Sequence, residues 1–200
     1  MSEAWFGGSF SPPHIGHLVL AERVREARGL KRVHLLVSAE PPHAQGKQAI
    51  EASHRLAMAK LAVAGNPGLD VDDRELRRGG KSYTIDTARE LIAQGIRRPA
   101  FIVGGDMLAD LPSWREGAEL LRLADVIPVL RPGFGWEVFE ALRAAFGDEA
   151  ARRVRDLCVK TPLLQISSSE MRERLLAGKS IRYLVPDAVI EYIGQKGLYT

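Results

Sequence analysis

Cysteine is almost absent from this chain of 200 residues, which contains only Cys158. A single thiol excludes an internal disulfide and suits a reducing compartment. No apolar run approaches the ~20 residues that span a bilayer. The first residues, MSEAWFGG, also lack the basic and apolar segments of a signal peptide. We therefore expect a cytoplasmic protein with no membrane partner.

A large excess of one charge is also lacking. The chain carries 28 basic and 25 acidic side chains, a formal net charge of +3, and its basic residues are spread out apart from short pairs such as Arg77–Arg78. This excess is too small to indicate a nucleic-acid partner. Hydrophobic residues make up 46% of the chain, which suits a soluble protein with a substantial core. We expect one domain, residues 1–200.

Short apolar segments alternate with segments of helical periodicity. We expect strands at residues 4–8, 32–38, 69–76, 100–105 and 125–130, separated by helices of roughly 10 to 15 residues. This alternation predicts an α/β fold with a doubly wound parallel sheet. Pro128 indicates that the fifth strand lies near an edge. A helical region at 136–157 and a short extended segment at 163–167 follow, and residues 166–200 form a small C-terminal helical subregion.

Three residues predict helix boundaries. Gly29 stands where the first helix should close in a left-handed conformation. Ser53 is expected to cap the helix after the second strand. Pro186 is expected at the first position of the last helix, where its missing N–H costs nothing.

The segment GGSFSPPHIGH, residues 7–17, follows the first expected strand. Gly7 and Gly8 allow the backbone to approach a ligand closely, and a helix starting near Ile15 offers free N–H groups to a phosphate. His14 and His17 project to the same side of the opening turn and can donate hydrogen bonds to that phosphate. Two alternatives are a zinc site, for which no third ligand is suitably spaced, and ordinary surface histidines.

A second segment, ISSSEMR at 166–172, also joins an extended stretch to a helix. Its three serines offer hydroxyl groups and N-terminal amides, and Arg172 offers a planar set of donors that fits a phosphate. The alternative is a serine-rich helix cap with a solvated arginine.

HIGH and ISSSEMR resemble the HxGH and ISSTxxR motifs of the nucleotidylyltransferase superfamily. Further segments resemble one family in it, the bacterial nicotinate-nucleotide adenylyltransferases. These segments are GGSFSPPHIGH, the PPH at 41–43, RELRRGGKSYTIDT, FIVGGDMLADLPSW, LRPG and the carboxyl-terminal IRYLVPDAVIEYIGQKGLY. The chain departs from the family pattern at Ser9, Ser11 and Ala44, and the last departure removes a basic residue that Lys47 could replace.

The resemblance implies a Rossmann-like nucleotidylyltransferase fold. It also implies transfer of the adenylyl group of ATP to nicotinate mononucleotide, which gives deamido-NAD and pyrophosphate in NAD biosynthesis. Mg²⁺ would be bound with ATP and not in a protein metal site, and the chain could form a homodimer. The mononucleotide's phosphate is largely ionised at neutral pH, so the reaction needs alignment and charge stabilisation more than a base.

The resemblance also assigns site residues. The catalytic residues would be His14, His17 and Arg172. ATP would be bound by Gly7, Gly8, Ser9, Phe10, His14, Gly16, His17, Gly104, Asp106, Arg131, Ile166, Ser167, Ser168 and Arg172. Nicotinate mononucleotide would be bound by Ser9, His43, Tyr83, Thr84, Asp106 and Trp114. Two of these residues could have a structural role instead of binding a ligand: Trp114 could be a core residue, and Asp106 could be a helix cap.

Other functions are compatible with parts of the sequence. Another adenylyltransferase of the superfamily, such as the pantetheine-phosphate type, is opposed by SYTIDT and LPSW. A fragment of a tRNA synthetase is opposed by the lack of a KMSKS-like stretch. A nucleotide-sensing module without turnover is opposed by the intact His14, His17, Ser168 and Arg172.

Overall fold

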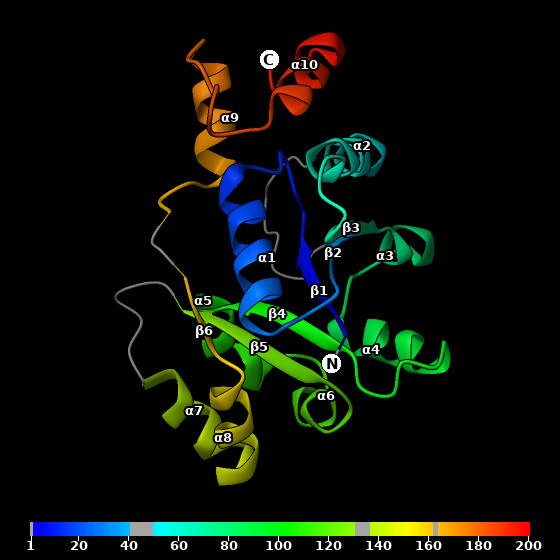
Figure 1. The fold of residues 1–200 in the computed structure, drawn as a ribbon, viewed down its shortest axis with the longest axis vertical. Coiled ribbons are helices and arrows are strands. Elements are labelled where there is room, and N and C mark those ends of the chain that lie inside the picture. The colour runs from blue at the N-terminus through cyan, green and yellow to red at the C-terminus, as the bar shows by residue number, and fades with distance from the viewer. Residues whose placement is uncertain (1, 41–49, 131–136, 162–163) are drawn as a thin grey trace.

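The computed structural model describes residues 2–40, 50–130, 137–161 and 164–200 (Figure 1). Its centre is a parallel sheet of six strands in the order β3-β2-β1-β4-β5-β6. The strands are β1 (Glu3–Gly8), β2 (Arg32–Val37), β3 (Leu69–Asp72), β4 (Ala100–Gly104), β5 (Asp125–Leu130) and β6 (Val159–Lys160). The order reverses between β1 and β4, so the predicted doubly wound parallel sheet is confirmed.

Helices cover both faces of the sheet. They are α1 (Ile15–Ala27), α2 (Ala52–Val63), α3 (Arg74–Arg78), α4 (Thr84–Ala93), α5 (Gly105–Ala109), α6 (Gly117–Leu123), α7 (Glu137–Phe146), α8 (Asp148–Asp156), α9 (Ser168–Leu176) and α10 (Asp187–Lys196), with a 3₁₀ turn η1 at Leu111–Ser113. No helix in the described ranges has the length and apolarity needed to cross a membrane.

The alternating side chains of the strands build two core layers. In β4, Phe101 and Val103 pack with α4, α5, α6, α7 and α8, while Ala100 and Ile102 pack with α1 and α2 on the other face. Strands buried on both faces read as continuous apolar runs, which is why they could be located from the sequence.

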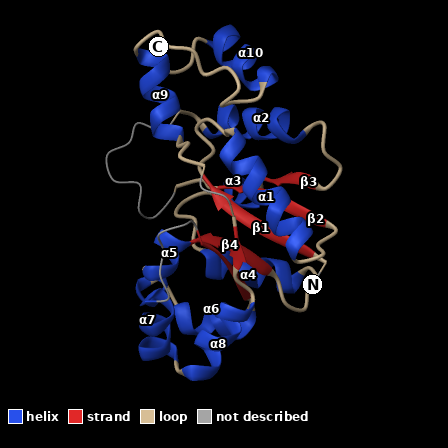
Figure 2. Ribbon diagram, turned by 60° about the vertical axis from the view of Figure 1, so that its left-hand side comes forward, coloured by secondary structure: helices blue, strands red, loops and turns tan. Residues whose placement is uncertain are grey.

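The last two helices form a third cluster beyond the end of the sheet. Met171 of α9 and Val189 and Ile193 of α10 are buried together with Met58 of α2. Figure 2 shows α9 and α10 beside α2, on the opposite side of the molecule from α7 and α8. Helix α2 therefore connects the sheet to the C-terminal helices.

The structure corrects several expected boundaries. The sixth strand is Val159–Lys160, and residues 164–167 form no strand. A two-residue strand is too short to produce an apolar pattern. The expected strand at 69–76 ends at Asp72, and α3 follows it. Pro128 does lie near an edge, because β6 pairs only with Val129 and Leu130 of β5.

The expected helix caps had mixed outcomes. Gly29 follows the last residues of α1 with a φ of 59°, as predicted. The predicted cap at Ser53 is wrong, because α2 begins at Ala52 with Glu51 as its cap residue. Pro186 is the cap residue of α10 and not its first residue, one position earlier than predicted.

Candidate active site

A cavity of about 740 Å³ opens at the carboxyl ends of β1 and β4, where the strand order reverses. This is the position at which open α/β sheets bind their ligands. The predicted site residues in its wall are Gly7, Gly8, Ser9, His14, Gly16, His17, Tyr83, Thr84, Gly104, Asp106, Trp114, Ile166, Ser167, Ser168 and Arg172. Residues more than 150 positions apart in the sequence thus share one cavity.

The two histidines stand at the first turn of α1. His14 is the cap residue, and its backbone N–H donates to Nδ1 of His17 at 3.2 Å. The two imidazole rings are stacked with their centroids 3.7 Å apart. His14 is only 5% exposed, which excludes the alternative of two ordinary surface histidines.

Phe10 and Gly16 support these rings. Phe10 is 1% exposed, does not line the cavity, and packs edge-on against His17 with centroids 5.1 Å apart. Its side chain therefore belongs to the core, which leaves only its backbone for the predicted contact with ATP. A Cβ on Gly16 would lie 3.0 Å from Nδ1 of His14, so this glycine makes room for the imidazole.

The serine segment is bonded directly to the loop that carries the histidines. Ser168 Oγ donates to the carbonyl oxygen of Pro12 at 2.8 Å. Arg172 donates to the carbonyl oxygen of Ser11 at 2.8 Å and to Oγ of Ser169 at 3.0 Å. Ser167 caps α9 by accepting from a backbone N–H, as its alternative interpretation held. The two motifs are therefore joined by hydrogen bonds.

Tyr199 also holds this loop, a role that was not assigned to it although it ends the quoted carboxyl-terminal segment. Its hydroxyl forms a hydrogen bond of 2.9 Å with Oγ of Ser11. Burial raises the pKa of Tyr199 to about 12, so the phenol is neutral near pH 7. Ser11, one of the three residues at which this chain departs from the family pattern, thus has a partner within the chain.

An aromatic corner lies across the cavity from these loops. Tyr83 caps α4 and Thr84 begins it, so the N–H groups of these two residues have no partner within the helix. Trp114 follows η1, lines the cavity and also packs against the core. Its buried Nε1 has no hydrogen-bond partner among the described residues. The guanidinium of Arg115 lies 4.8 Å from the centre of the Tyr83 ring.

Gly104 and Asp106 form the wall at the end of β4. Gly104 is the cap residue of α5 and Asp106 lies in its first turn, so the alternative of Asp106 as the cap residue is wrong. A Cβ on Gly104 would lie 2.6 Å from Oδ1 of Asp106. Glycine is needed here to leave space for that carboxylate.

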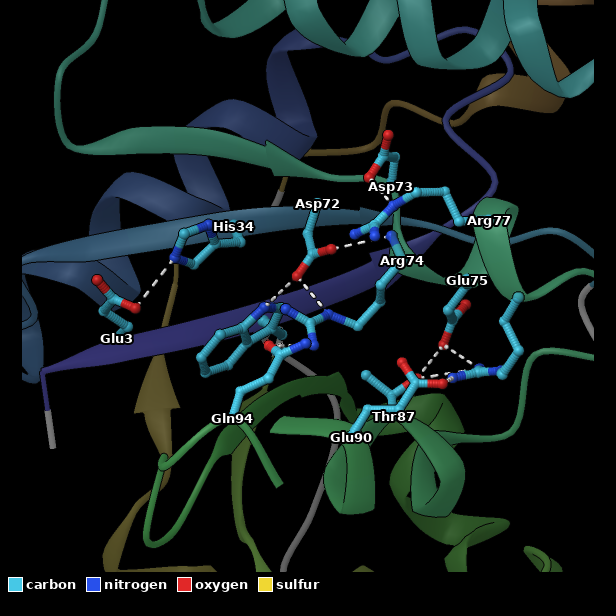
Figure 3. A network of polar contacts seen from close by, with 12 residues as sticks. Glu3, His34, Asp72, Asp73, Arg74, Glu75, Arg77, Thr87, Glu90 and Gln94 are labelled. Carbon is cyan, nitrogen blue, oxygen red and sulfur yellow. Dashed lines mark hydrogen bonds and ion pairs between the residues drawn. The ribbon is translucent and has the colours of Figure 1, made fainter. Parts of the chain in front are cut away.

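Two buried charged residues in the cavity wall, Arg55 and Glu75, were missed from the sequence. Figure 3 shows Glu75 facing Thr87, whose hydroxyl donates to it at 2.7 Å. Burial raises the pKa of Glu75, although hydrogen bonds from Thr87 and Ser82 oppose the shift. Arg55 stands in no motif, and a charged residue on a helix normally indicates an exposed position. Glu75 belongs to the RELRRGGKSYTIDT segment, but it was expected at the end of a strand and no role was assigned to it.

Two predicted site residues, His43 and Arg131, lie outside the described residues, as do Ala44 and Lys47. In the ranges that are described, no three His, Cys, Asp or Glu side chains gather closely enough to hold a metal ion.

The sequence matches known proteins over nearly its whole length. The family model for cytidylyltransferase-like proteins matches residues 5–174. A probable nicotinate-nucleotide adenylyltransferase of Symbiobacterium thermophilum is 42% identical, over 98% of this chain and 94% of the relative. Another, from Roseiflexus sp. (strain RS-1), is 44% identical over 96% of this chain and 95% of the relative. The chain belongs to the nicotinate-nucleotide adenylyltransferase family.

A solved structure supports the fold of this family member. The nicotinic acid mononucleotide adenylyltransferase of Plasmodium falciparum, complexed with NaAD, superposes with a TM-score of 0.71 at 20% sequence identity. The match covers 99% of this chain and 97% of that one. Membership in a nicotinate-nucleotide adenylyltransferase family makes the chain a nucleotidyltransferase and confirms the resemblance drawn from its motifs.

Proposed function

We propose that the chain transfers the adenylyl group of ATP to nicotinate mononucleotide and releases pyrophosphate. One observation carries this proposal: a single cavity joins two phosphate-binding segments to an aromatic corner. The segments are the first turns of α1 and α9, and the corner contains Tyr83 and Trp114. The names of the close relatives support the same pair of substrates.

In this reaction an oxygen of the mononucleotide's 5′-phosphate attacks the α-phosphorus of ATP. The bond from that phosphorus to the bridging oxygen of the β-phosphate breaks, and pyrophosphate leaves with the electron pair. The second pKa of such a phosphate is about 6, so no base must remove a proton at neutral pH. The protein has to align two anions and stabilise the charge that moves onto the leaving group.

We assign this stabilisation to the two phosphate-binding segments. His14 and His17 donate to the triphosphate, with His17 nearest the α-phosphate, while Ser168 and Arg172 hold the β- and γ-phosphates. The guanidinium of Arg172 donates to the backbone carbonyl of Ser11. This bond holds the guanidinium beside the loop that carries the two histidines. Mg²⁺ would enter with ATP and be held by its phosphates, where it would screen their charge.

We assign the pyridine ring to the aromatic corner. Trp114 stacks on the ring, and the free N–H groups at Tyr83 and Thr84 receive its carboxylate. Such donors favour an anionic carboxylate over a neutral amide.

We also propose that the chain forms a homodimer and acts in the cytoplasm. Light scattering, which measures the molar mass in solution, tests the dimer.

The test is pyrophosphate release from ATP with Mg²⁺ and one acceptor at a time. We expect release with nicotinate mononucleotide and a lower kcat/KM with nicotinamide mononucleotide. Equal efficiency with both would contradict the assignment of Tyr83 and Thr84. Release only with phosphopantetheine would identify the pantetheine-phosphate type, and nucleotide binding without release would identify a sensor.

A further inference from the structure

Arg55 is a buried cation that the reaction outlined above does not use. It lies on α2, is 2% exposed, and forms part of the cavity wall. Its guanidinium donates to four carbonyl oxygens: Ser38 at 2.7 Å, Ser9 at 3.1 Å, Ala39 at 3.1 Å and Ile50 at 3.4 Å. One side chain therefore holds the backbone after β1 and the backbone after β2.

The carbonyl of Ala39 extends this connection to the aromatic corner. The N–H of Ala39 donates to Oγ of Ser82 at 2.9 Å, and the N–H of Ser82 donates to the carbonyl oxygen of Glu40 at 2.9 Å. Ser82 directly precedes Tyr83, the cap residue of α4. Arg55 is thus bonded to Ser9 on one side. On the other side it is linked, through Ala39 and Ser82, to the aromatic corner that contains Tyr83.

The charge of Arg55 is not matched by a carboxylate in the described part of the chain. Burial lowers its pKa, and among the described residues the charge interaction that opposes this shift is with the hydroxyl of Tyr199. A buried cation is costly unless an anion or a full set of acceptors accompanies it. Four carbonyl oxygens accept from four of its five N–H groups, but they leave a positive charge at the wall of a cavity that receives two anions in the proposed reaction.

Arg98 shows what an arginine with a purely structural role looks like here. It also donates to three carbonyl oxygens, those of Leu121, Arg122 and Ala124, at 2.7 to 3.0 Å. Its charge, however, is paired with Asp125 at 2.7 Å, and it precedes β4 at the opposite end of the sheet. Arg55 differs from it in burial, in its missing carboxylate and in its place at the cavity.

We infer that Arg55 is a positioning residue for the mononucleotide substrate. It fixes the distance between the loop at Ser9 and the aromatic corner at Tyr83, and its charge attracts the mononucleotide's phosphate. This inference rests on the proposed function, since it concerns how that substrate is held. Both effects act on the mononucleotide more than on ATP, whose triphosphate is assigned to α1 and α9.

The experiment compares Arg55→Lys and Arg55→Met with the control Arg98→Met, using only proteins whose circular dichroism shows a folded state. For each variant, KM is measured for ATP and for nicotinate mononucleotide. The dissociation constants of nicotinate mononucleotide and of nicotinate riboside, which lacks the phosphate, are measured by calorimetry. The riboside separates the effect of the charge on the phosphate from general damage to the pocket.

For Arg55→Met we expect kcat/KM for nicotinate mononucleotide to fall by about 10²-fold, because both the charge and the loop spacing are lost. The KM for ATP should change by less than about threefold, and the riboside should bind less tightly by a smaller factor than the mononucleotide. Arg55→Lys keeps the charge but loses the planar set of guanidinium donors. It should therefore bind the mononucleotide more tightly than Arg55→Met does, without reaching the kcat of the parent. Arg98→Met should lower only the melting temperature.

Three results would overturn the inference. The first is mononucleotide kinetics within about twofold of the parent in a folded Arg55→Met protein. The second is an equal loss for ATP, the riboside and the mononucleotide, which would indicate a general structural defect. If Arg55→Met does not fold, parent-like kinetics in Arg55→Lys would be the third. A parent protein that never releases pyrophosphate with nicotinate mononucleotide would instead contradict the proposed function.

Discussion

The imidazole rings of His14 and His17 lie in contact, stacked with their planes 25° apart. The backbone N–H of His14 donates to Nδ1 of His17, and Phe10 packs edge-on against the same His17 ring, so His17 has little rotational freedom. A fixed donor needs no reorganisation when charge develops on a phosphate, which is the condition for effective electrostatic catalysis. The pair is therefore prepared before any nucleotide binds.

His17→Ala should lower kcat by about 10²- to 10³-fold, the usual loss when one such donor is removed. Steady-state pyrophosphate release measures the effect, and circular dichroism checks the fold. His54→Ala is a matched control, because His54 bonds to the hydroxyl of Tyr192 on α10. A His17→Ala enzyme that turns over like the control would remove His17 from this role.

Trp114 tests the aromatic corner. Trp114→Phe keeps a ring for stacking and removes the unpartnered Nε1, so we expect stability near that of the parent and an increase in the mononucleotide KM of about threefold to tenfold. Trp114→Ala should raise that KM further and destabilise the fold by about 3 kcal/mol, since the indole packs against the core. Urea unfolding and initial rates measure both quantities. An unchanged mononucleotide KM in Trp114→Ala would indicate a core residue alone.

Asp72 should stabilise the fold at neutral pH. Burial alone would raise its pKa, but bonds from the backbone and guanidinium of Arg74 and from the indole of Trp5 outweigh burial and lower it (Figure 3). A pKa lowered on folding contributes stability above the unfolded value, near 3.8, and this stability is lost as the pH falls through the folded pKa. Asp72→Asn should therefore cost about 1.5 to 3 kcal/mol near pH 7 and less in acid. A cost that does not change with pH would contradict this.

Glu75 should show the opposite dependence. Its pKa is raised by burial above the usual 4.5, so its contribution is present below pH 4.5 and is lost as the pH rises through the folded pKa. The free energy of unfolding of Glu75→Gln minus that of the parent should increase as the pH rises above 4.5, because only the parent loses stability there. Urea unfolding across that window measures it. A relative stability that falls with rising pH would show that the carboxylate is held in its charged form.

Local sequence patterns predicted the buried strands and the two motif segments, whereas contacts between distant residues had no such pattern. The buried strands and the segments at His14 and Ser168 carry local patterns, and the structure places those segments around one cavity. Arg55 lies in an ordinary helical pattern and Glu75 was expected at the end of a strand, and tertiary packing buries both charges. Tyr199 reaches Ser11 from 188 positions away, so no local pattern could indicate the contact.

Arg172→Lys tests the second phosphate-binding segment. The guanidinium donates at once to Ser11 and Ser169, a geometry that a lysine ammonium cannot reproduce. If this fork also receives the phosphates of ATP, the substitution should lower kcat/KM for ATP by about 10²-fold while the charge is kept. Arg174→Lys is the control on the same helix, because Arg174 does not line the cavity and donates to the carbonyl of Ser180. Equal kinetics in the two variants would show that Arg172 only holds the loop, and that the phosphates of ATP are bound by the helix termini and the histidines.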